Sequence, residues 1–398
     1  MMGQSFAESV MIDGPTWRRG WIRLLAVGGV AILCCLGALF DEPQRLIFSY
    51  LTALLFFVTI GWGAMFFVCM HHLTGAVWTV SLRRLMEGGM MTLFPAALAF
   101  VPLLFGLSEL YEWTDSDVVA ADALLSEKRG YLNQPFFLFR TLAYFGVWGT
   151  GALWLYRRSV EQDRASGSDR HEDVGRWSGP ILITTFVTVT FASFDWLMSL
   201  EPHWYSAVFG VYVYSGSVVG FVAVLILVVQ ACHAGGKLRE MVHVEHQHDL
   251  GRWLFALIMF WAYIAFSQYL LIWYANVPEE TVWFQKRLES DWRVVAQVLV
   301  IGHFGVPFFV LMSRLAKRNQ RVLFLTAGWV LSMHYLDLYW IIMPALTSSS
   351  AFHWSDVAAF VAIGCVVGSG VWWLFRERPL VPVGDVRLAE SVDLRRAD

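Results

Sequence analysis

The 398-residue chain carries little charge: Asp, Glu, Lys and Arg make up 15% of it, against about 25% in soluble domains. Apolar residues make up 57%, and 20 Trp and 30 Phe contribute to that excess. The net charge of −3 gives no indication of nucleic-acid binding. This composition excludes an ordinary soluble domain and indicates an integral membrane protein that contacts lipid.

Cysteine is also scarce, and neither CxxC nor CxxCH occurs. This excludes a disulfide framework and c-type haem attachment, and it argues against a cysteine-ligated metal or iron–sulfur cluster.

Only His303 and His334 lie well inside apolar segments, at different depths, so histidines facing each other across a haem b are not expected. The HVEHQH stretch at 243–248 is expected to be a solvated loop. We therefore expect no cofactor and no metal bound by this chain. The five cysteines are Cys34, Cys35, Cys69, Cys232 and Cys365.

Long apolar runs dominate the sequence. The first is followed by another such run and not by a signal-peptide cleavage site, and no segment alternates as barrel strands do. About 20 apolar residues cross a bilayer as a helix. The pattern predicts an all-α integral membrane protein with about ten transmembrane helices. The predicted spans are 21–40, 47–70, 90–110, 136–156, 180–200, 208–232, 252–274, 293–315, 321–344 and 354–375.

Most of the 29 Lys and Arg fall on one side of the membrane if the N-terminus is cytoplasmic, which predicts that both termini lie inside. Residues 1–20 then form an inner segment and 21–375 the membrane domain. The tail 376–398 is polar, contains two prolines and is expected to be loosely ordered. The acidic connection 111–135 is predicted to lie outside, either as a docking surface for an extrinsic partner or as a solvated connector.

Two predicted spans contain a carboxylate more than two residues from either end. Asp195 lies near the outer end of span five, and His334 and Asp337 lie three residues apart on one face of span nine. A carboxylate in hydrocarbon costs on the order of 3 kcal/mol, so intramembrane Asp residues are functional candidates. We predict that Asp195, His334 and Asp337 relay protons, with Glu201 and His203 near the exit. Hydrogen bonding between helices is the alternative.

Further polar residues are predicted at similar depth. The expected partners of Asp195 are Gln268, Tyr212 and His203. His303 is predicted near the middle of the membrane, where it either forms a hydrogen bond to a neighbouring helix or has a functional role. A hydroxyl face on span five either lines a water-filled path or bonds back to the helix's own carbonyls. That face consists of Thr184, Thr188 and Ser199.

A weak repeat relates the two aspartates. Asp195 stands seven residues before Pro202, and Asp337 stands seven before Pro344, four spans later. Parallel repeats occur in membrane proteins. The repeat predicts two four-helix bundles, at about 47–200 and 208–344, with spans one and ten peripheral.

Two long motifs carry a family resemblance. FDWLMSLEPHWYS followed by FGVYVYSGS, together with AFSQYLLIWYANVPEETVWF, resembles the membrane subunits of bacterial alternative complex III, within the NrfD / polysulfide-reductase membrane-subunit family. The SQYLLIWYANVPEET stretch is more similar to the second, shorter of its two membrane subunits. The ten spans and inner termini agree with that family over nearly the whole chain.

The resemblance implies a subunit of a quinol:electron-acceptor oxidoreductase in the bacterial cytoplasmic membrane. Its partners would be a sister NrfD-like subunit, an extrinsic iron–sulfur subunit and c-type cytochromes. It implies a proton path and no redox cofactor in this chain. The family's established quinol site belongs to the other membrane subunit, so a quinone-facing surface on this chain stays an open alternative. Two alternatives stay open: a secondary transporter with an outer polar substrate site, and a structural anchor for cytochromes. The transporter alternative predicts spans broken in the middle by Gly or Pro, for which Pro95, Pro102 and Pro307 are candidates.

Overall fold

The computed structural model describes residues 10–12, 19–164 and 171–393. Residues 1–9 and 13–18 of the predicted N-terminal segment, and 394–398 of the tail, lie outside the described residues. Apart from turns and one isolated β-bridge between Met11 and Pro379, the described part of the chain is built from helices. The prediction of an all-α membrane protein is confirmed.

Nine helical segments of the described chain are long and apolar enough to cross a membrane. The remaining predicted span forms a 31-residue helix, α10, that packs on α11 and α6. Two spans are interrupted by other helical turns, namely a 3₁₀ turn η1 and a π turn η4. In chain order the spans are α3 (Gly20–Asp41), α4 (Pro43–Thr74), α5–α6–η1–α7 (Val80–Met90, Leu93–Phe100, Val101–Gly106, Leu107–Leu110), α10 (Gln134–Arg164), α11 (His171–Trp196), α12 (Phe209–Ala234), α13 (Val244–Ala275), α15–η4–α16 (Trp292–Leu299, Val300–Gly305, Val306–Met312), α18 (Gln320–Ile342) and α19 (Trp354–Phe375).

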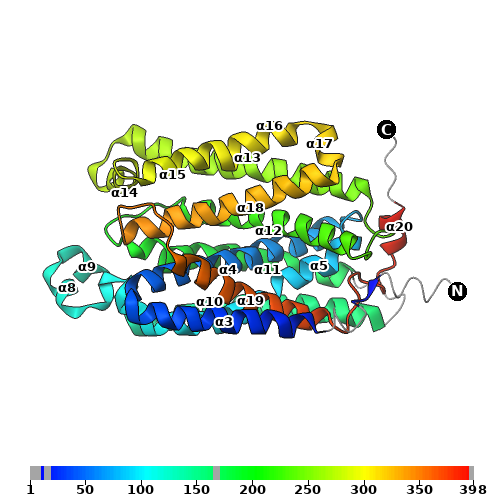
Figure 1. Ribbon diagram of the computed structural model, residues 1–398, viewed down its shortest axis with the longest axis horizontal. Coiled ribbons are helices and arrows are strands. Elements are labelled where there is room, and N and C mark those ends of the chain that lie inside the picture. The colour runs from blue at the N-terminus through cyan, green and yellow to red at the C-terminus, as the bar shows by residue number, and fades with distance from the viewer. Residues whose placement is uncertain (1–9, 13–18, 165–170, 394–398) are drawn as a thin grey trace.

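The spans form two bundles joined through α4 and α12. Bundle one contains α4, the interrupted span α5–α7, α10 and α11; bundle two contains α12, α13, the interrupted span α15–α16 and α18. Helices α3 and α19 pack on each other along their length, and α19 packs on α4 (Figure 1). They therefore flank bundle one, as the repeat predicts for spans one and ten.

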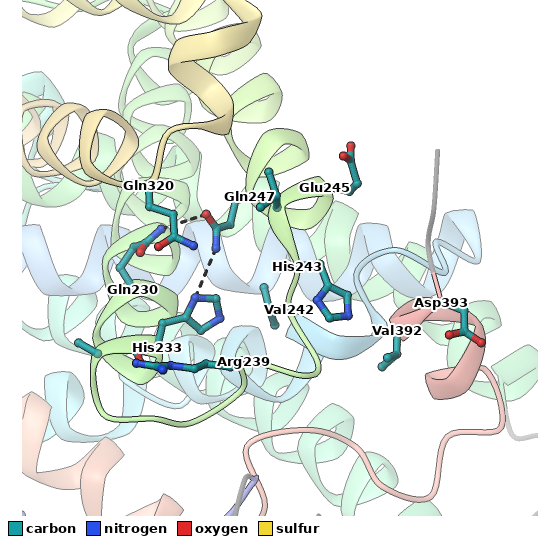
Figure 2. Close-up of a pocket in the computed structure, with 12 residues that line it drawn as sticks. Gln230, His233, Arg239, Val242, His243, Glu245, Gln247, Gln320, Val392 and Asp393 are labelled. Atoms are coloured by element: carbon teal, nitrogen blue, oxygen red, sulfur yellow. Dashed lines mark hydrogen bonds between the residues drawn. The ribbon is translucent and has the colours of Figure 1, made fainter. Parts of the chain in front are cut away.

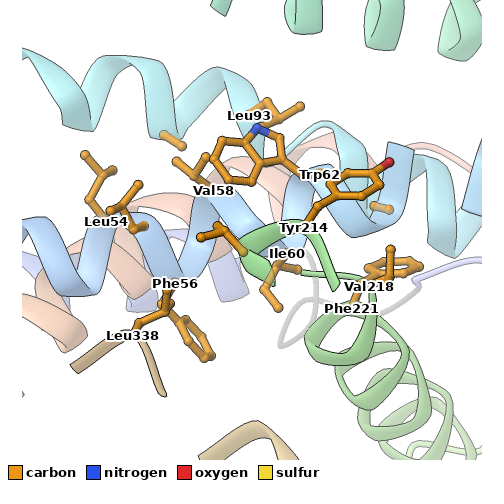
Figure 3. Packing of buried hydrophobic residues seen from close by; sticks show 14 of the residues in the cluster. Leu54, Phe56, Val58, Ile60, Trp62, Leu93, Tyr214, Val218, Phe221 and Leu338 are labelled. Carbon is orange, nitrogen blue, oxygen red and sulfur yellow. The ribbon is translucent and has the colours of Figure 1, made fainter. Parts of the chain in front are cut away.

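Helix α4 is the core of the fold because it is apolar on every face. Figure 3 shows its side chains, from Leu54 to Trp62, packed against residues of α6, α12 and α18. A Cβ on Gly63 would lie only 2.3 Å from the backbone oxygen of Ser217, so this glycine lets α4 and α12 approach closely.

Short helices cover both ends of the molecule. The end that carries α20 (Leu388–Val392) and Met11 is called here the terminal end, and the opposite end the distal end (Figure 1). The distal end carries α8 (Ser116–Ala121), α9 (Ala123–Lys128) and α14 (Pro278–Leu288). Further short turns are η2 (Glu112–Thr114), η3 (Met198–Leu200), α17 (Arg314–Arg318) and η5 (Met343–Ala345).

The sequence between the predicted spans 47–70 and 90–110 reads as a long loop, but most of it is helical, because α4 continues to Thr74 and α5 begins at Val80. HVEHQH is likewise not a solvated loop: α13 begins at Val244, and His246 and His248 are buried. In both places buried polar side chains find partners inside the protein, and these partners are not visible in the hydropathy of the segment.

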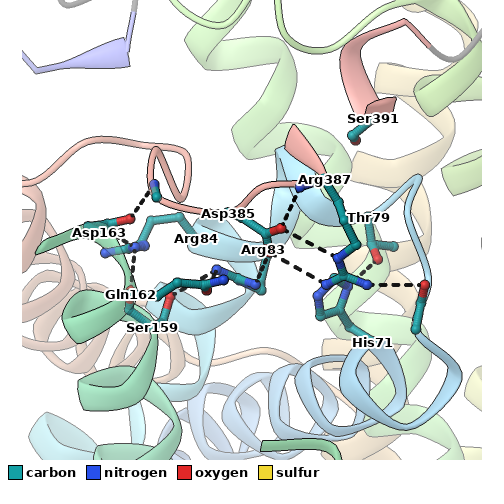
Figure 4. Close-up of polar contacts among 12 residues, drawn as sticks. His71, Thr79, Arg83, Arg84, Ser159, Gln162, Asp163, Asp385, Arg387 and Ser391 are labelled. Atoms are coloured by element: carbon teal, nitrogen blue, oxygen red, sulfur yellow. Dashed lines mark hydrogen bonds and ion pairs between the residues drawn. The ribbon is translucent and has the colours of Figure 1, made fainter. Parts of the chain in front are cut away.

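The tail is ordered through residue 393, contrary to expectation, because a buried ionic network holds it (Figure 4). Arg83 Nη1 lies 2.6 Å from Asp385 of the tail, and Arg84 Nη2 lies 2.6 Å from Asp163. Both arginines also pair with Glu87, at 3.2 and 3.1 Å. Burial by itself would raise the pKa of Asp385, but attraction by Arg83, together with the hydrogen bonds and charge of Arg387, outweighs burial and lowers the pKa below its ordinary value.

Candidate functional site

Asp195 is completely buried at the end of α11, where a cation neutralises it. Arg140 of α10 donates to the carboxylate twice, from Nε at 2.8 Å and from Nη2 at 2.9 Å, and Tyr144 donates a third hydrogen bond at 2.6 Å. The Arg140 guanidinium also lies over the Tyr131 ring, 3.9 Å from its centroid. Asp195 thus forms a two-point ion pair that fixes α11 to α10.

The predicted partners of Asp195 are wrong. Gln268 and Tyr212 belong to bundle two, and His203 bonds Asp122 at the distal surface, at 2.6 Å. The Leu125 backbone amide and His203 both lower the pKa of Asp122. Sequence position placed Asp195 near the end of its helix but did not give the direction in which its side chain points.

The hydroxyl face of α11 does not lead to the Asp195 carboxylate. Thr184 and Thr188 donate to the helix's own carbonyls four residues earlier, and Ser199 donates to the backbone oxygen of Asp195. Thr184 is exposed on the outside of the bundle. Of the two interpretations of this face, a water-filled path or hydrogen bonds back to the helix's own carbonyls, the contacts fit the second.

Glu201 lies at the distal surface and pairs with α14. Its carboxylate lies 2.9 Å from Lys286 Nζ and 3.1 Å from Arg287 Nη1. Arg287 is 1% exposed, and it also donates to the Trp340 and Ile341 carbonyl oxygens at the end of α18. Burial lowers the pKa of Arg287 to about 10, although Glu201 opposes the shift. Glu201 therefore ties the α11–α12 connection to α14 and α18.

Asp337 of α18 is as buried as Asp195 but has a different environment. Tyr212 of α12 donates to one carboxylate oxygen, and Trp261 Nε1 of α13 donates to the other at 3.1 Å. Both donors are neutral, and within the described residues no cation bonds this carboxylate. Asp337 can therefore exchange a proton without breaking an ion pair.

His334, one turn before Asp337, faces away toward bundle one. Its Nε2 lies 2.9 Å from Thr59 Oγ1 of α4. A Cβ on Gly220 would lie 2.7 Å from His334 Cδ2, so this position of α12 needs a glycine to accommodate the ring. His334 and Asp337 both contact α12, at Gly220 and Tyr212 respectively, but their hydrogen-bond partners differ, since His334 pairs with Thr59 of α4.

His303 lies in the π turn η4, completely buried. Its ring lies against the Trp261 ring at a tilt of 34°, with centroids 4.0 Å apart, and neither ring nitrogen has a hydrogen-bond partner among the described residues. Trp329 Nε1 donates to the Gly302 carbonyl oxygen at 2.7 Å, which satisfies one group of the π turn. π turns are frequent at functional sites.

A cavity of about 730 Å³ lies beside Asp337, between α13, α14, α18 and the α15–η4 segment. Its wall is mainly aromatic and aliphatic, and its polar groups come from Asp337, Tyr212, Gln268, Tyr269 and Gln297. Gln268 is buried, and its Oε1 has no hydrogen-bond partner in the described structure. The cavity is large enough for a drug-sized ligand and has a polar inner part.

The cavity opens sideways toward the surface of the spans. Phe266, Val300 and Ile301 line it and are also 60%, 66% and 64% exposed, as lipid-facing side chains are. Trp283 and Phe284 of α14 cover its distal side. An amphipathic molecule can therefore enter from the bilayer and place a polar group near Asp337.

Sequence reasoning missed Arg140 and Tyr144 as partners of Asp195, and Trp261 as a partner of Asp337. The one signal available was spacing: Arg140 and Tyr144 stand four apart on α10, hence on one face. For Trp261 the sequence holds no comparable signal, because 20 Trp residues are spread over the chain and most would be read as interfacial anchors.

The helices define a multi-pass membrane protein. Comparison of the chain with family models gives no match, and comparison with curated proteins gives none. Among the described residues, no group of three or more His, Cys, Asp or Glu side chains has the arrangement to hold a metal ion.

Proposed function

We propose that this chain is a membrane subunit of a quinol-oxidising respiratory complex, and that quinol binds in the cavity beside Asp337. The observation that carries the proposal is a buried carboxylate with neutral hydrogen-bond donors at the inner part of an apolar cavity open to the bilayer. A quinol matches it in chemistry, since it joins a ring with two hydroxyl groups to an apolar tail and resides in the membrane.

Oxidation of a quinol releases two electrons and two protons. Asp337 accepts one proton from a quinol hydroxyl, while Tyr212 and Trp261 hold its carboxylate in place; the second proton is released to water at the distal end. Gln268 offers an amide to the second oxygen of the ring. The electrons leave to an extrinsic iron–sulfur or c-type cytochrome subunit, because this chain supplies no redox cofactor in the proposal.

The remaining parts of the proposal follow the family resemblance. The chain lies in a bacterial cytoplasmic membrane with both termini cytoplasmic, beside a sister NrfD-like subunit. The distal end is then the outer side, and protons leave there past Glu201 and His203. The ion pair of Asp195 with Arg140 supports a structural role for Asp195, so that Asp337 and His334 remain the candidates for proton relay.

The test fills the cavity. Ala265 lines it, so Ala265→Trp should abolish quinol oxidation by the purified native assembly while leaving its haem content unchanged. The matched control is Val357→Trp on α19, where the side chain is 64% exposed and lies outside the cavity, and it should keep activity. Equal activity of both variants would contradict the proposal.

A secondary transporter is the second candidate. The π turn in span eight, beside a polar cavity, favours it, since transporters place interrupted helices at substrate sites. The two functions differ on purification: haem and iron–sulfur subunits should accompany a respiratory subunit, whereas a transporter should purify without them.

A further inference from the structure

A second cavity, of about 980 Å³, lies at the terminal end, where Figure 2 shows the residues of α12, α13 and α20 that line it. Buried polar side chains at its wall bond one another: Gln230 Nε2 donates to Gln247 Oε1 at 3.3 Å, and Gln247 Nε2 lies 3.3 Å from His233 Nδ1. Gln320, the first residue of α18, also lines this cavity, and Asp337 lies roughly 25 Å further along the same helix. Groups that hold the helix turn of Asp337 therefore come from the distal end.

The end of α18 lacks one of its own hydrogen-bond donors. Asp337 lies less than two turns before this end, which is at Ile342, and Pro344 follows. In an α-helix the carbonyl oxygen of one residue accepts from the N–H group four residues later, so Pro344 leaves the Trp340 oxygen without its intrahelical donor. Trp340 is buried, so its carbonyl oxygen needs a donor from another part of the chain.

Arg287 of α14 supplies that donor. Its Nε donates to the Trp340 oxygen at 3.3 Å, and its Nη2 donates to the Ile341 oxygen at 2.8 Å. Its Nη1 donates to Glu201 at 3.1 Å and to the Trp283 oxygen of its own helix at 3.0 Å. All three guanidinium nitrogens thus have acceptors, and the side chain is only 1% exposed. One side chain joins α14 to the end of α18.

The same guanidinium contacts the distal cover of the Asp337 cavity. Trp283 and Phe284 of α14 line that cavity, and Trp340 lines it from α18. Arg287 Cζ lies 3.5 Å from the centroid of the Trp283 ring and 5.6 Å from that of Trp340. Arg287 therefore holds aromatic walls on two helices together without lining the cavity itself.

We propose that Arg287 is a positioning residue for quinol oxidation, which holds Asp337 and the aromatic cover in the arrangement that proton transfer requires. This inference rests on the function proposed above. A general base acts only within hydrogen-bond reach of the proton that it takes up, so a displacement of about 1 Å at the end of α18 slows the reaction about a hundredfold. Glu201 neutralises the buried cation, which leaves the guanidinium to act through its geometry.

The test measures kcat and KM of the native assembly, per haem, for Arg287→Lys. Lysine keeps the positive charge beside Glu201, but an ammonium group offers its donors at one point and cannot span the carboxylate and the two carbonyl oxygens of α18. kcat should fall about tenfold or more while KM changes less than about threefold, because the lost interaction acts in the transition state. A role in assembly alone would lower the yield and leave kcat per haem unchanged. Arg287→Gln, which leaves no buried cation, serves if Arg287→Lys does not assemble, and the same fall in kcat is expected.

Two variants of α14 separate the possible causes. Lys286→Met removes the other partner of Glu201, which is 45% exposed and lies outside the cavity, and should change kcat and KM less than about twofold. Phe284→Leu trims the cavity wall, which contacts bound quinol in the ground state and the transition state alike. It should raise KM severalfold with little change in kcat.

Hydrogen exchange supplies a readout that does not depend on turnover. Amides at 338–347 and 278–288 should exchange faster in Arg287→Lys than in Lys286→Met. Normal kcat in Arg287→Lys, or a loss of kcat with unchanged exchange at 338–347, would overturn the proposal. Ala265→Trp separates the two claims: if it stays active, the quinol site is wrong and the role of Arg287 falls with it. An inactive Ala265→Trp beside a fully active Arg287→Lys refutes the positioning role alone.

Discussion

Asp195→Asn should lower the free energy of unfolding by about 3 to 5 kcal/mol, the cost of breaking a buried ion pair from one side. The carboxylate is fully buried and accepts two hydrogen bonds from Arg140 and one from Tyr144. Asparagine keeps one acceptor oxygen but turns an NH₂ group toward these donors. The substitution also leaves the Arg140 guanidinium, only 8% exposed, without its counter-ion.

The assay is the denaturation midpoint of the detergent-purified protein, read by tryptophan fluorescence. A matched control is Glu161→Gln, which breaks an ion pair with Arg158 whose side chains are 48% and 42% exposed. That variant should change stability by less than about 1 kcal/mol, because water screens exposed pairs. Replacing both partners, Arg140→Met with Asp195→Leu, should restore much of the loss, since no unpaired buried charge then remains.

The reasoning is refuted if Asp195→Asn unfolds like the unmodified protein. If such a stable variant also lost quinol turnover or proton release, Asp195 would be a proton relay after all. Suppose instead that the double variant proves less stable than Asp195→Asn. The ion pair would then stabilise the fold by more than is regained when the unpaired charge is removed, and the loss of about 3 to 5 kcal/mol would be wrong.

Three other predictions follow from the sequence and the terminal-end network. Cysteine labelling should reach 157–179 and 233–251 from the cytoplasm and 111–135 from outside, and the opposite pattern would reverse the orientation. The purified single chain should show no haem spectrum and no stoichiometric iron, and a haem spectrum would contradict this. Because the folded-state pKa of Asp385 is lowered, its pairing with Arg83 stabilises the tail above the unfolded pKa and is lost as pH falls through the folded pKa. Protease cleavage of the tail should thus rise below about pH 4, and Asp385→Asn should cleave readily at neutral pH.

Apolar run length predicted the spans well, because a helix in lipid must satisfy its own backbone and needs a fixed length. The contacts between helices could not be predicted. Asp195 and Arg140 lie on different helices, 55 positions apart, and neither segment indicates which helix faces pack together.

The sequence also misled where buried charges hold structure. Arg83 and Arg84 fall between two predicted spans, where charged residues are usually solvated, but each is almost fully buried and paired with Glu87. The tail suggested disorder by its composition, but Asp385 anchors it to Arg83. Hydropathy averages over a segment, whereas the pairs Arg83–Asp385 and Arg84–Asp163 depend on single charges that stand 302 and 79 positions apart in the chain.

Quinol oxidation by the intact assembly carrying Asp337→Asn tests the central claim most directly. Asparagine preserves the size of the side chain and can still accept from Trp261, but it cannot take up a proton. The account predicts an assembly with normal haem and iron content whose turnover falls about a hundredfold or more, as for loss of a general base. Full turnover with full proton release from the Asp337→Asn assembly would contradict it.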